Sequence, residues 1–207
     1  ALPPAASGDP RPAADTSYAC AIDGHGNAFS ATPSDGSSAT PIIPGTGLCP
    51  SSRGSQPWTD PAIPAVMAPG KRPRLTPNPA LALKDGKLFM PFGSPGNDIQ
   101  PQAMTQVFLN IVLWGMEPQA AVEAPRFATY SFPSSSEPHA YHPGRVNIES
   151  RVDANTTEEL ARLGHKVALW QPLEWRAGAV CAIRVNEENG LLEGAADPRR
   201  PCYALGI

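Results

Sequence analysis

The sequence lacks the features that mark several large classes of protein. Its 207 residues include only four cysteines, and no two are spaced as Cys-x-x-Cys, which argues against a zinc ribbon or a dithiol redox motif. No basic run exceeds two residues and the net charge is −3, so nucleic acids and anionic membranes are poor candidate partners. No apolar run approaches the roughly 18 residues that a membrane-spanning helix needs. The first residues also lack the basic-then-apolar pattern of a signal peptide, so we expect a cytoplasmic rather than a periplasmic or secreted location.

The familiar catalytic and cofactor motifs are missing too. The chain contains no Gly-x-Ser-x-Gly elbow, no His-Glu-x-x-His helix, no phosphate-binding P-loop and no Gly-x-Gly-x-x-Gly motif that opens a helix. We therefore expect neither a metal nor an organic cofactor. What remains as candidate chemistry lies around Thr16, the glycine turn at 93–97 and the segment 70–79.

The distribution of proline divides the chain. The 26 prolines concentrate ahead of residue 80 and predict long irregular loops there. Residues 1–15 are rich in Ala and Pro and are typical of a flexible linker, whereas residues 16–207 suffice for one domain with a buried core. We expect the chain to be the C-terminal part of a longer product.

The remaining patterns predict an α+β domain with strands, then helices, then strands. Turn residues between apolar segments predict three hairpins, over 17–32, 79–92 and 178–195, and further strands are expected at 126–130, at 145–149 and after Gly164. The segment 99–116 predicts the main helix, because one face of it would collect these apolar residues: Met104, Val107, Phe108, Ile111 and Val112.

Two shorter helices complete the prediction. One should cover 118–124, between prolines, and the other should begin at an N-cap at Asn155 or Thr156 and stop at Gly164. The basic tail 196–200, "ADPRR", is open to two interpretations. It could bind an anion, but a terminal turn is the simpler hypothesis.

Thr16 stands where the linker meets the first predicted strand. A threonine hydroxyl is a weak nucleophile unless a base lies beside it. If the chain were cut between Asp15 and Thr16, the freed α-amino group, with a pKa near ~8, could serve as that base. The alternative is an ordinary loop that enters a strand, and composition alone favours this alternative.

Four segments carry a resemblance to a known family: "DTSYACAIDGHGNAFSAT", "APGKRPRLTPNPALALKDGKLFMPFGSPGNDIQPQAM", "EAPRF" and "GAADPRR". Together, in this order, they resemble the small subunit of the gamma-glutamyltranspeptidase family of N-terminal-nucleophile hydrolases. The resemblance implies a four-layer αββα sandwich in which this chain is the C-terminal half. It also implies a large subunit, cut from the same precursor, as partner.

The resemblance assigns catalytic roles by position. Thr16 falls on the nucleophile, and Ser34 falls on a threonine that hydrogen-bonds the nucleophile's amine, a role for which another hydroxyl is a fair substitute. Gly96 and Asn97 fall on two glycines whose backbone N–H groups form the oxyanion hole. Asn97 departs from glycine, but Asn is the residue that best tolerates a positive φ after glycine.

The substrate pocket departs further from the family pattern. The positions of a carboxylate-binding Ser-Ser pair read Leu75-Thr76, an acidic position reads Gln56, and an amide position reads Arg53. An asparagine position reads Gly36. We expect Arg53, Gln56 and Thr76 to bind substrate, since a guanidinium suits a carboxylate. The alternative is that Arg53 braces a loop. Arg74 is open to the same two interpretations, and loop bracing is favoured for it.

Three functions follow from these residues. We expect an amidohydrolase that uses Thr16 to hydrolyse a small carboxylate-bearing amide, with the oxamate amidohydrolase branch as an analogue. A gamma-glutamyltransferase or glutathione hydrolase is the first alternative. A family member that never matures and has no activity is the second.

Overall fold

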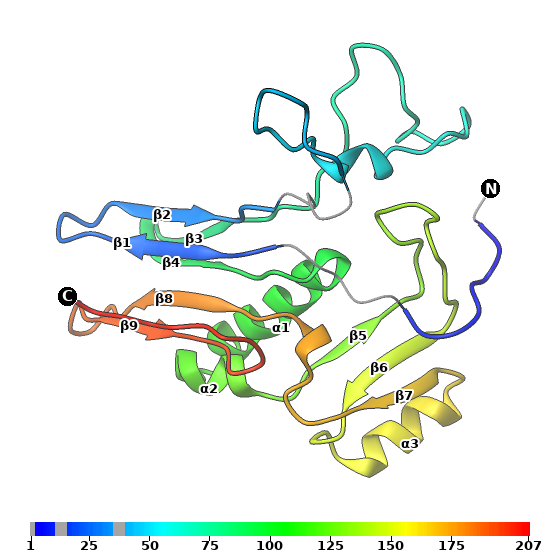
Figure 1. Ribbon diagram of the computed structural model, residues 1–207. Helices are drawn as coiled ribbons and strands as arrows, with labels where there is room; N and C mark the ends of the chain where they lie inside the picture. Colours follow the sequence, from blue (N-terminus) through cyan, green and yellow to red (C-terminus); the bar gives the residue numbers. More distant parts are fainter. Residues whose placement is uncertain (1–2, 11–15, 35–39) are drawn as a thin grey trace.

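A four-stranded antiparallel sheet forms the centre of the fold (Figure 1). The computed structural model describes residues 3–10, 16–34 and 40–207. The order in the sheet is β3-β4-β8-β9. Its strands are β3 Ala80–Lys84, β4 Lys87–Gly93, β8 Cys181–Val185 and β9 Leu192–Ala195. The β3–β4 turn is Asp85-Gly86, and both residues have positive φ (50° and 77°), as a tight hairpin requires.

The two faces of this sheet carry different layers. Phe92 and Gly93 are neighbours in β4 and therefore face opposite sides. The Phe92 ring packs on Phe108 of α1 (Gln100–Val112), with ring centroids 5.5 Å apart. Gly93 lies against the ring of Tyr18, which precedes β1. The helices therefore cover one face, and the β1–β2 hairpin covers the other (Figure 1).

The remaining elements complete the layers. The hairpin consists of β1 Ala19–Ile22 and β2 Ala28–Ala31, and α2 covers Pro118–Glu123 beside α1. A separate three-stranded sheet has the order β5-β6-β7, in which β5–β6 is antiparallel and β6–β7 is parallel. Its strands are β5 Phe127–Thr129, β6 Arg145–Glu149 and β7 Lys166–Trp170, and α3 Ala154–Arg162 joins the last two. Three short 3-10 helices are η1 Ser52–Ser55, η2 Asn97–Ile99 and η3 Trp175–Ala177.

The predicted elements all form, and three details differ from the sequence-based expectations. Val112 was expected on the buried face of α1, but it is 40% exposed because it is the last helical residue, beyond the edge of the core. The N-cap of α3 is Asp153, whose carboxylate accepts from the Asn155 N–H, so the predicted cap at Asn155 or Thr156 was wrong. The tail "ADPRR" does form a turn, but this turn is buried rather than terminal.

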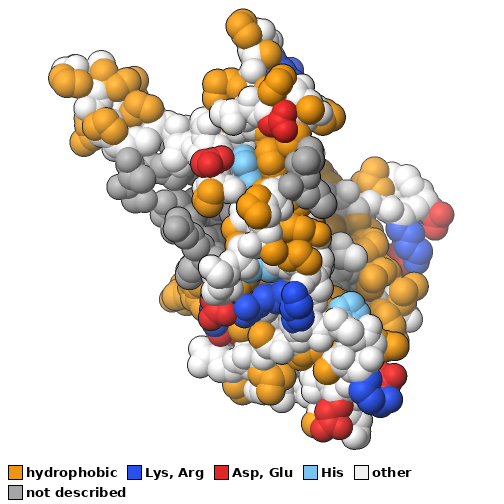
Figure 2. All heavy atoms as spheres, turned by 90° about the vertical axis from the view of Figure 1, so that its right-hand side faces the viewer, with side chains coloured by type: hydrophobic (Ala, Val, Ile, Leu, Met, Phe, Trp, Pro, Cys, Tyr) orange, Lys and Arg blue, Asp and Glu red, His pale blue; other side chains and the backbone are white. Residues whose placement is uncertain are grey.

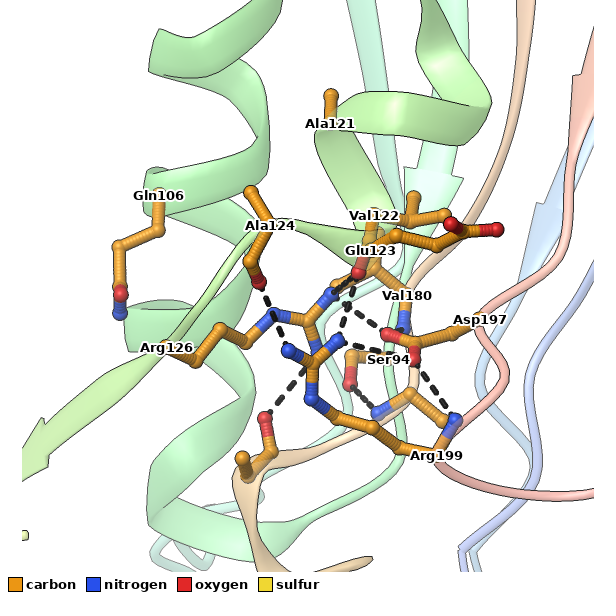
Figure 3. Close-up of polar contacts among 12 residues, drawn as sticks. Ser94, Gln106, Ala121, Val122, Glu123, Ala124, Arg126, Val180, Asp197 and Arg199 are labelled. Atoms are coloured by element: carbon orange, nitrogen blue, oxygen red, sulfur yellow. Dashed lines mark hydrogen bonds and ion pairs between the residues drawn. The ribbon is translucent and has the colours of Figure 1, made fainter. Parts of the chain in front are cut away.

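A buried ionic network explains that burial. Arg126 pairs with Asp197 at 2.5 Å, and both side chains are at most 2% exposed. Arg199 binds the carboxylate of Glu149 with two N–H groups, at 2.7 and 2.8 Å, and also contacts Asp197 at 3.1 Å. Figure 3 shows the two guanidinium groups side by side, with the Asp197 carboxylate and main-chain carbonyls around α2 as acceptors. The network attaches the C-terminal turn to β6 and α2. These bonds hold the turn in place, because a buried charge that lost its partner would be strongly destabilising.

The loops between β2 and β3 form the upper part of the molecule in Figure 1. Figure 2 shows hydrophobic side chains on the surface of this upper part, and the large exposed ones include Ile42, Leu48 and Met67. None of the helices in the described part of the chain is long and apolar enough to cross a bilayer.

Candidate active site

Thr16 and Ser34 face each other across an antiparallel bridge at the open end of the β1–β2 hairpin. Their hydroxyl oxygens, Oγ1 and Oγ, are 2.7 Å apart. The Ser17 N–H donates to the Pro33 carbonyl at 2.9 Å, which extends the hairpin ladder to these residues. Both side chains are only half-buried. The hairpin therefore presents two hydroxyl groups together at its end.

Arg53 brings a positive charge to this pair. Its Nη2 donates to the Ser34 carbonyl at 2.8 Å and also contacts Ser34 Oγ. Its Nη1 donates to Thr76 Oγ1 at 2.8 Å. The guanidinium thus ties η1 to the end of β2 and to the segment that leads into β3. These contacts brace the loops, which is the alternative role considered for Arg53.

Gln56 is a buried member of the same cluster and forms hydrogen bonds with Arg53 and Arg74. Its side chain is 1% exposed. Its Oε1 accepts from Arg53 Nη1 at 2.9 Å, and its Nε2 donates to the Arg74 carbonyl at 2.6 Å. Arg74 itself is exposed, as is Leu75 at 56%. The Arg53, Gln56 and Thr76 side chains therefore form one hydrogen-bonded group beside Ser34, whereas the Leu75 side chain does not join it.

The glycine turn follows β4 directly. Gly96 has φ 134° and Asn97 has φ 53°, so both adopt conformations that L-residues rarely take. Gly96 is buried, and a Cβ there would lie 3.4 Å from Gly178 Cα. Among the residues that the structure describes, the Gly96 N–H has no hydrogen-bond acceptor. It is a backbone donor that a developing oxyanion could use.

Gln100 connects this turn to the Arg53 cluster, and sequence reasoning missed it. The side chain is fully buried. Its Oε1 accepts from the Asn97 N–H at 2.9 Å, and its Nε2 donates to the Thr76 carbonyl at 3.1 Å and to Asn78 Oδ1 at 3.0 Å. The signal was a polar residue in the first turn of a helix whose other inward residues are apolar. The Asn97 N–H is thus engaged by protein, unlike that of Gly96.

The Tyr18 ring joins the segment between Thr16 and β1 to β4, just ahead of the glycine turn. A Cβ on Gly93 would lie 2.2 Å from Tyr18 Cε2, so only glycine allows this approach. The Tyr18 hydroxyl lies 2.8 Å from Ser30 Oγ. Burial raises the pKa of the phenol well above its usual range, which keeps it protonated. Thr16, two residues before Tyr18, and Gly96, three residues after Gly93, therefore flank segments that pack together.

A cavity of about 230 Å³ opens beside the turn. Gly96, Asn97 and Asp98 form one wall. The rest of the lining comes mainly from the 130–142 region and includes Tyr130, Phe132, Ser136, Pro138 and His142. Burial raises the pKa of Tyr130 to about 12 and lowers that of His142, so both rings are uncharged near neutral pH. The cavity is therefore a mostly apolar recess next to a free backbone donor.

The predicted site residues thus lie in two groups. Thr16, Ser34, Arg53, Gln56 and Thr76 share one hydrogen-bonded cluster, and Gly96 and Asn97 lie on the adjoining turn, joined to the cluster through Gln100. Asp15 and Gly36 fall outside the described residues. Within 3–10, 16–34 and 40–207, no group of His, Cys, Asp and Glu side chains is arranged to hold a metal ion.

Comparison with known proteins shows which family the chain resembles. The model of the family described as Gamma-glutamyltranspeptidase matches residues 3–207. The chain is 34% identical over 197 residues to the glutathione hydrolase-like YwrD proenzyme of Bacillus subtilis, covering 93% of this chain and 36% of that protein. It is 35% identical over 169 residues to the oxamate amidohydrolase proenzyme of Klebsiella pneumoniae, covering 80% and 30%. The chain therefore spans about a third of the length of these curated relatives.

A solved structure shows the fold. The chain superposes with a TM-score of 0.75 on gamma-glutamyltranspeptidase from Pseudomonas nitroreducens complexed with L-DON, covering 92% of this chain and 98% of that one, at 21% identity. This likeness confirms the predicted N-terminal-nucleophile hydrolase fold, in which the present chain matches the small-subunit region.

Proposed function

Because this chain belongs to the gamma-glutamyltranspeptidase family, we propose that it carries the nucleophile of an N-terminal threonine amidohydrolase that acts on a small carboxylate-bearing amide. The observation that carries the proposal is the cluster at the hairpin end. There the Thr16 hydroxyl lies 2.7 Å from that of Ser34, and the Arg53 guanidinium contacts the same serine.

Maturation is the first proposed step. Thr16 Oγ1 attacks the carbonyl carbon of Asp15, and the C–O bond forms as the peptide C–N bond breaks. The hydroxyl proton passes to the departing nitrogen, which leaves an ester and a free Thr16 amine. Water then hydrolyses the ester and releases Asp15 as a carboxylate. The hydroxyl of Ser34 is placed to accept from or donate to Thr16 Oγ1 during this transfer. The names of both relatives include "proenzyme", which supports a self-cleaving precursor.

Catalysis then follows the chemistry of an activated hydroxyl. The α-amine of Thr16 takes the proton from Oγ1, which attacks the amide carbonyl of the substrate. The Gly96 N–H stabilises the oxyanion, and one such donor is worth about 3–4 kcal/mol of barrier. The amine returns the proton to the leaving nitrogen as the C–N bond breaks. Water, deprotonated by the same amine, releases the acyl group as a carboxylate. Asn97 can act as second donor only if its N–H leaves Gln100.

Arg53 selects the substrate in this proposal. A carboxylate is a stronger acceptor for a guanidinium than a neutral hydroxyl is. A substrate carboxylate can therefore replace the Thr76 hydroxyl as the acceptor of the Arg53 Nη1 bond. The Thr76 hydroxyl can then rotate and donate to the same carboxylate. None of the described side chains that contact Arg53 is acidic. Among the described residues, the cluster therefore supplies no carboxylate for the α-amino group of a γ-glutamyl substrate, which favours a small amide such as oxamate.

A large subunit completes the proposed enzyme. The chain covers only about a third of its relatives. The β1–β2 hairpin leaves Phe29 62% exposed, and β3 leaves Leu81 and Leu83 51% and 67% exposed. A two-stranded hairpin is marginally stable without further strands or a covering layer. We propose that the other part of the precursor covers these residues.

Two measurements on the full-length gene product test the proposal. Intact mass should reveal a species that begins at Thr16, and Thr16→Ala should leave one uncut precursor, while Thr156→Ala, an exposed threonine in α3, should mature normally. Ammonia release from oxamate should exceed turnover of γ-glutamyl-p-nitroanilide. Preferential turnover of the γ-glutamyl compound would instead establish the glutathione hydrolase alternative. A wild-type chain that never matures under any condition would establish a non-catalytic member.

A further inference from the structure

His139 makes a contact that the proposed chemistry does not use. Its ring is stacked on Trp58, with centroids 3.9 Å apart and an angle of 4° between the planes, and the residue is only 2% exposed. Nδ1 donates to the Ser134 carbonyl at 2.8 Å, and the backbone N–H donates to the Ser136 carbonyl at 2.8 Å. His139 also has a positive φ of 54°. The stack and the Nδ1 bond therefore fix the ring, and the backbone bond fixes the residue in the folded 134–140 loop.

The partner of this ring belongs to the substrate-binding segment. Trp58 lies two residues after Gln56 and five after Arg53. The Trp58 carbonyl accepts from the Met67 N–H at 2.8 Å, which fixes the backbone that carries the indole. A second contact joins the same two segments. The Glu137 N–H donates to the carbonyl of Ser55, the last residue of η1, at 2.8 Å. The 134–140 loop thus binds the end of η1, which contains Arg53, through a backbone hydrogen bond, and it binds Trp58, three residues further along, through the ring stack.

The other end of the loop holds the glycine turn. The Ser135 N–H donates to Asp98 Oδ2 at 2.8 Å, and the Ser135 hydroxyl donates to Asp98 Oδ1. Asp98 follows Asn97 directly, and Ser135 is fully buried. Ser134, Ser136, Glu137 and Pro138 also form part of the cavity wall beside Gly96. One short loop therefore contacts the segments that carry both halves of the site.

We propose that His139 and Trp58 are positioning residues that set the distance between the Arg53 guanidinium and the oxyanion donor, the Gly96 N–H. The inference rests on the proposed function. In a substrate such as oxamate, the carboxylate and the reacting carbonyl are adjacent carbons, so the spacing between their two binding groups must match closely. Misplacement by about 1 Å can cost on the order of a hundredfold in rate. Substrates without a carboxylate do not depend on that spacing.

A pair of small amides tests this. Oxamate and oxamide have the same skeleton, but oxamide has a neutral amide where oxamate has a carboxylate. In the full-length gene product, Trp58→Ala and His139→Asn should each lower the ratio of kcat/KM for oxamate to kcat/KM for oxamide by at least about tenfold. The turnover of oxamide should stay close to wild type. Asn is chosen at 139 because it tolerates the positive φ.

Two further variants separate positioning from mere stability. Trp58→Phe keeps a ring for the stack and should restore most of the discrimination. Trp114→Ala removes an indole that is 68% exposed beyond α1 and should change neither the ratio nor the melting temperature. A Trp58→Ala protein that melts earlier but keeps the wild-type ratio would overturn the positioning role. The proposed function fails by a different result, namely a wild-type enzyme that does not prefer oxamate to oxamide.

Discussion

The hydroxyl groups of Thr16 and Ser34 lie 2.7 Å apart, although the two residues are eighteen positions apart in the sequence. The antiparallel bridge between the two residues sets this distance, because it continues the β1–β2 ladder to the hairpin's open end. The Thr16 hydroxyl thus has a hydrogen-bond partner on a neighbouring strand. Such a partner orients a nucleophile without supplying the base itself.

Removal of the Ser34 hydroxyl should slow both cleavage and catalysis. Ser34→Ala leaves Thr16 Oγ1 without this partner, so we expect the rate of maturation and kcat to fall by about tenfold or more, with little change in KM. Ser34→Thr keeps the hydroxyl and should restore most of both rates. The time course of precursor cleavage on a gel and kcat for oxamate are the measurements. An alanine variant that matures and turns over at the wild-type rate would exclude a role for this hydroxyl.

Loss of the Arg53 guanidinium should remove the preference for a carboxylate. Arg53→Gln should raise KM for oxamate by at least about tenfold, since a charge-assisted bond is lost, and should affect oxamide much less. Arg53→Lys should rescue only partly, because an ammonium lacks the planar fork that reaches both Ser34 and Thr76. Arg74→Gln is the matched control, since only the main-chain carbonyl of Arg74 takes part in the cluster. Equal effects on both substrates would show that Arg53 only braces the loop.

A methyl group on Gly93 should disturb the contact between β4 and Tyr18. In Gly93→Ala the new Cβ would meet the Tyr18 ring at 2.2 Å, so strands must shift. We expect the free energy of unfolding to fall by about 1–3 kcal/mol, together with kcat. Gly24→Ala is the control, because a Cβ there meets nothing within 4 Å. Urea unfolding of both variants decides the matter, and equal stability would contradict the packing argument.

The buried carboxylate of Glu149 should contribute to stability in a way that depends on pH. Burial alone would raise the pKa of Glu149, but hydrogen bonds and charge from Arg199 hold it below its usual value of 4.5. A carboxyl with a lowered folded-state pKa stabilises the fold above its unfolded pKa, and this stability is lost as the pH falls through the folded value. We therefore expect the melting temperature to decrease below about pH 4.5.

Glu149→Gln tests this assignment. The neutral amide removes one of the two carboxylates that pair with the buried Arg199 guanidinium and leaves only Asp197, so we expect a loss of about 3 kcal/mol at pH 7. The acid-dependent part of the melting curve should become shallower in the same variant. Glu158→Gln, on the exposed surface of α3, should leave both quantities unchanged. A Glu149→Gln protein with the full acid sensitivity of the wild type would assign that sensitivity to other carboxyls.

Much of the fold could be predicted because the strands and helices depend on short-range sequence patterns. The Asp85-Gly86 and Asn189-Gly190 turns, with apolar alternation on either side, predict β3–β4 and β8–β9 correctly. The 3.6-residue period predicts α1, whose buried residues include Met104, Val107 and Ile111. Boundaries were less certain, since a cap such as Asp153 is decided by one side-chain bond at the helix end.

The Arg53 cluster could be predicted only in part. Residues 40–78 lack any periodicity, so their contacts depend on what other segments offer. The resemblance to a family identified Arg53, Gln56 and Thr76 as pocket residues, but not that they bind one another. Gln100 left one local signal, a polar residue at the start of an otherwise apolar helix face, but this signal did not identify Thr76 and Asn78, 24 and 22 positions away, as its partners. His139 gave no local signal of its contact with Trp58, which lies 81 positions away.

The sequence by itself determined the strands and helices, the hydroxyl at the start of the first strand and the membership of a family, since each depends on residue type and short-range order. Only the tertiary structure decided how the two halves of the site are joined. Those joints are the Gln100 side chain, the Tyr18–Gly93 contact and the Trp58–His139 stack. Each is a contact between segments distant in the chain, and such contacts exist only when the sheet and loops have packed together.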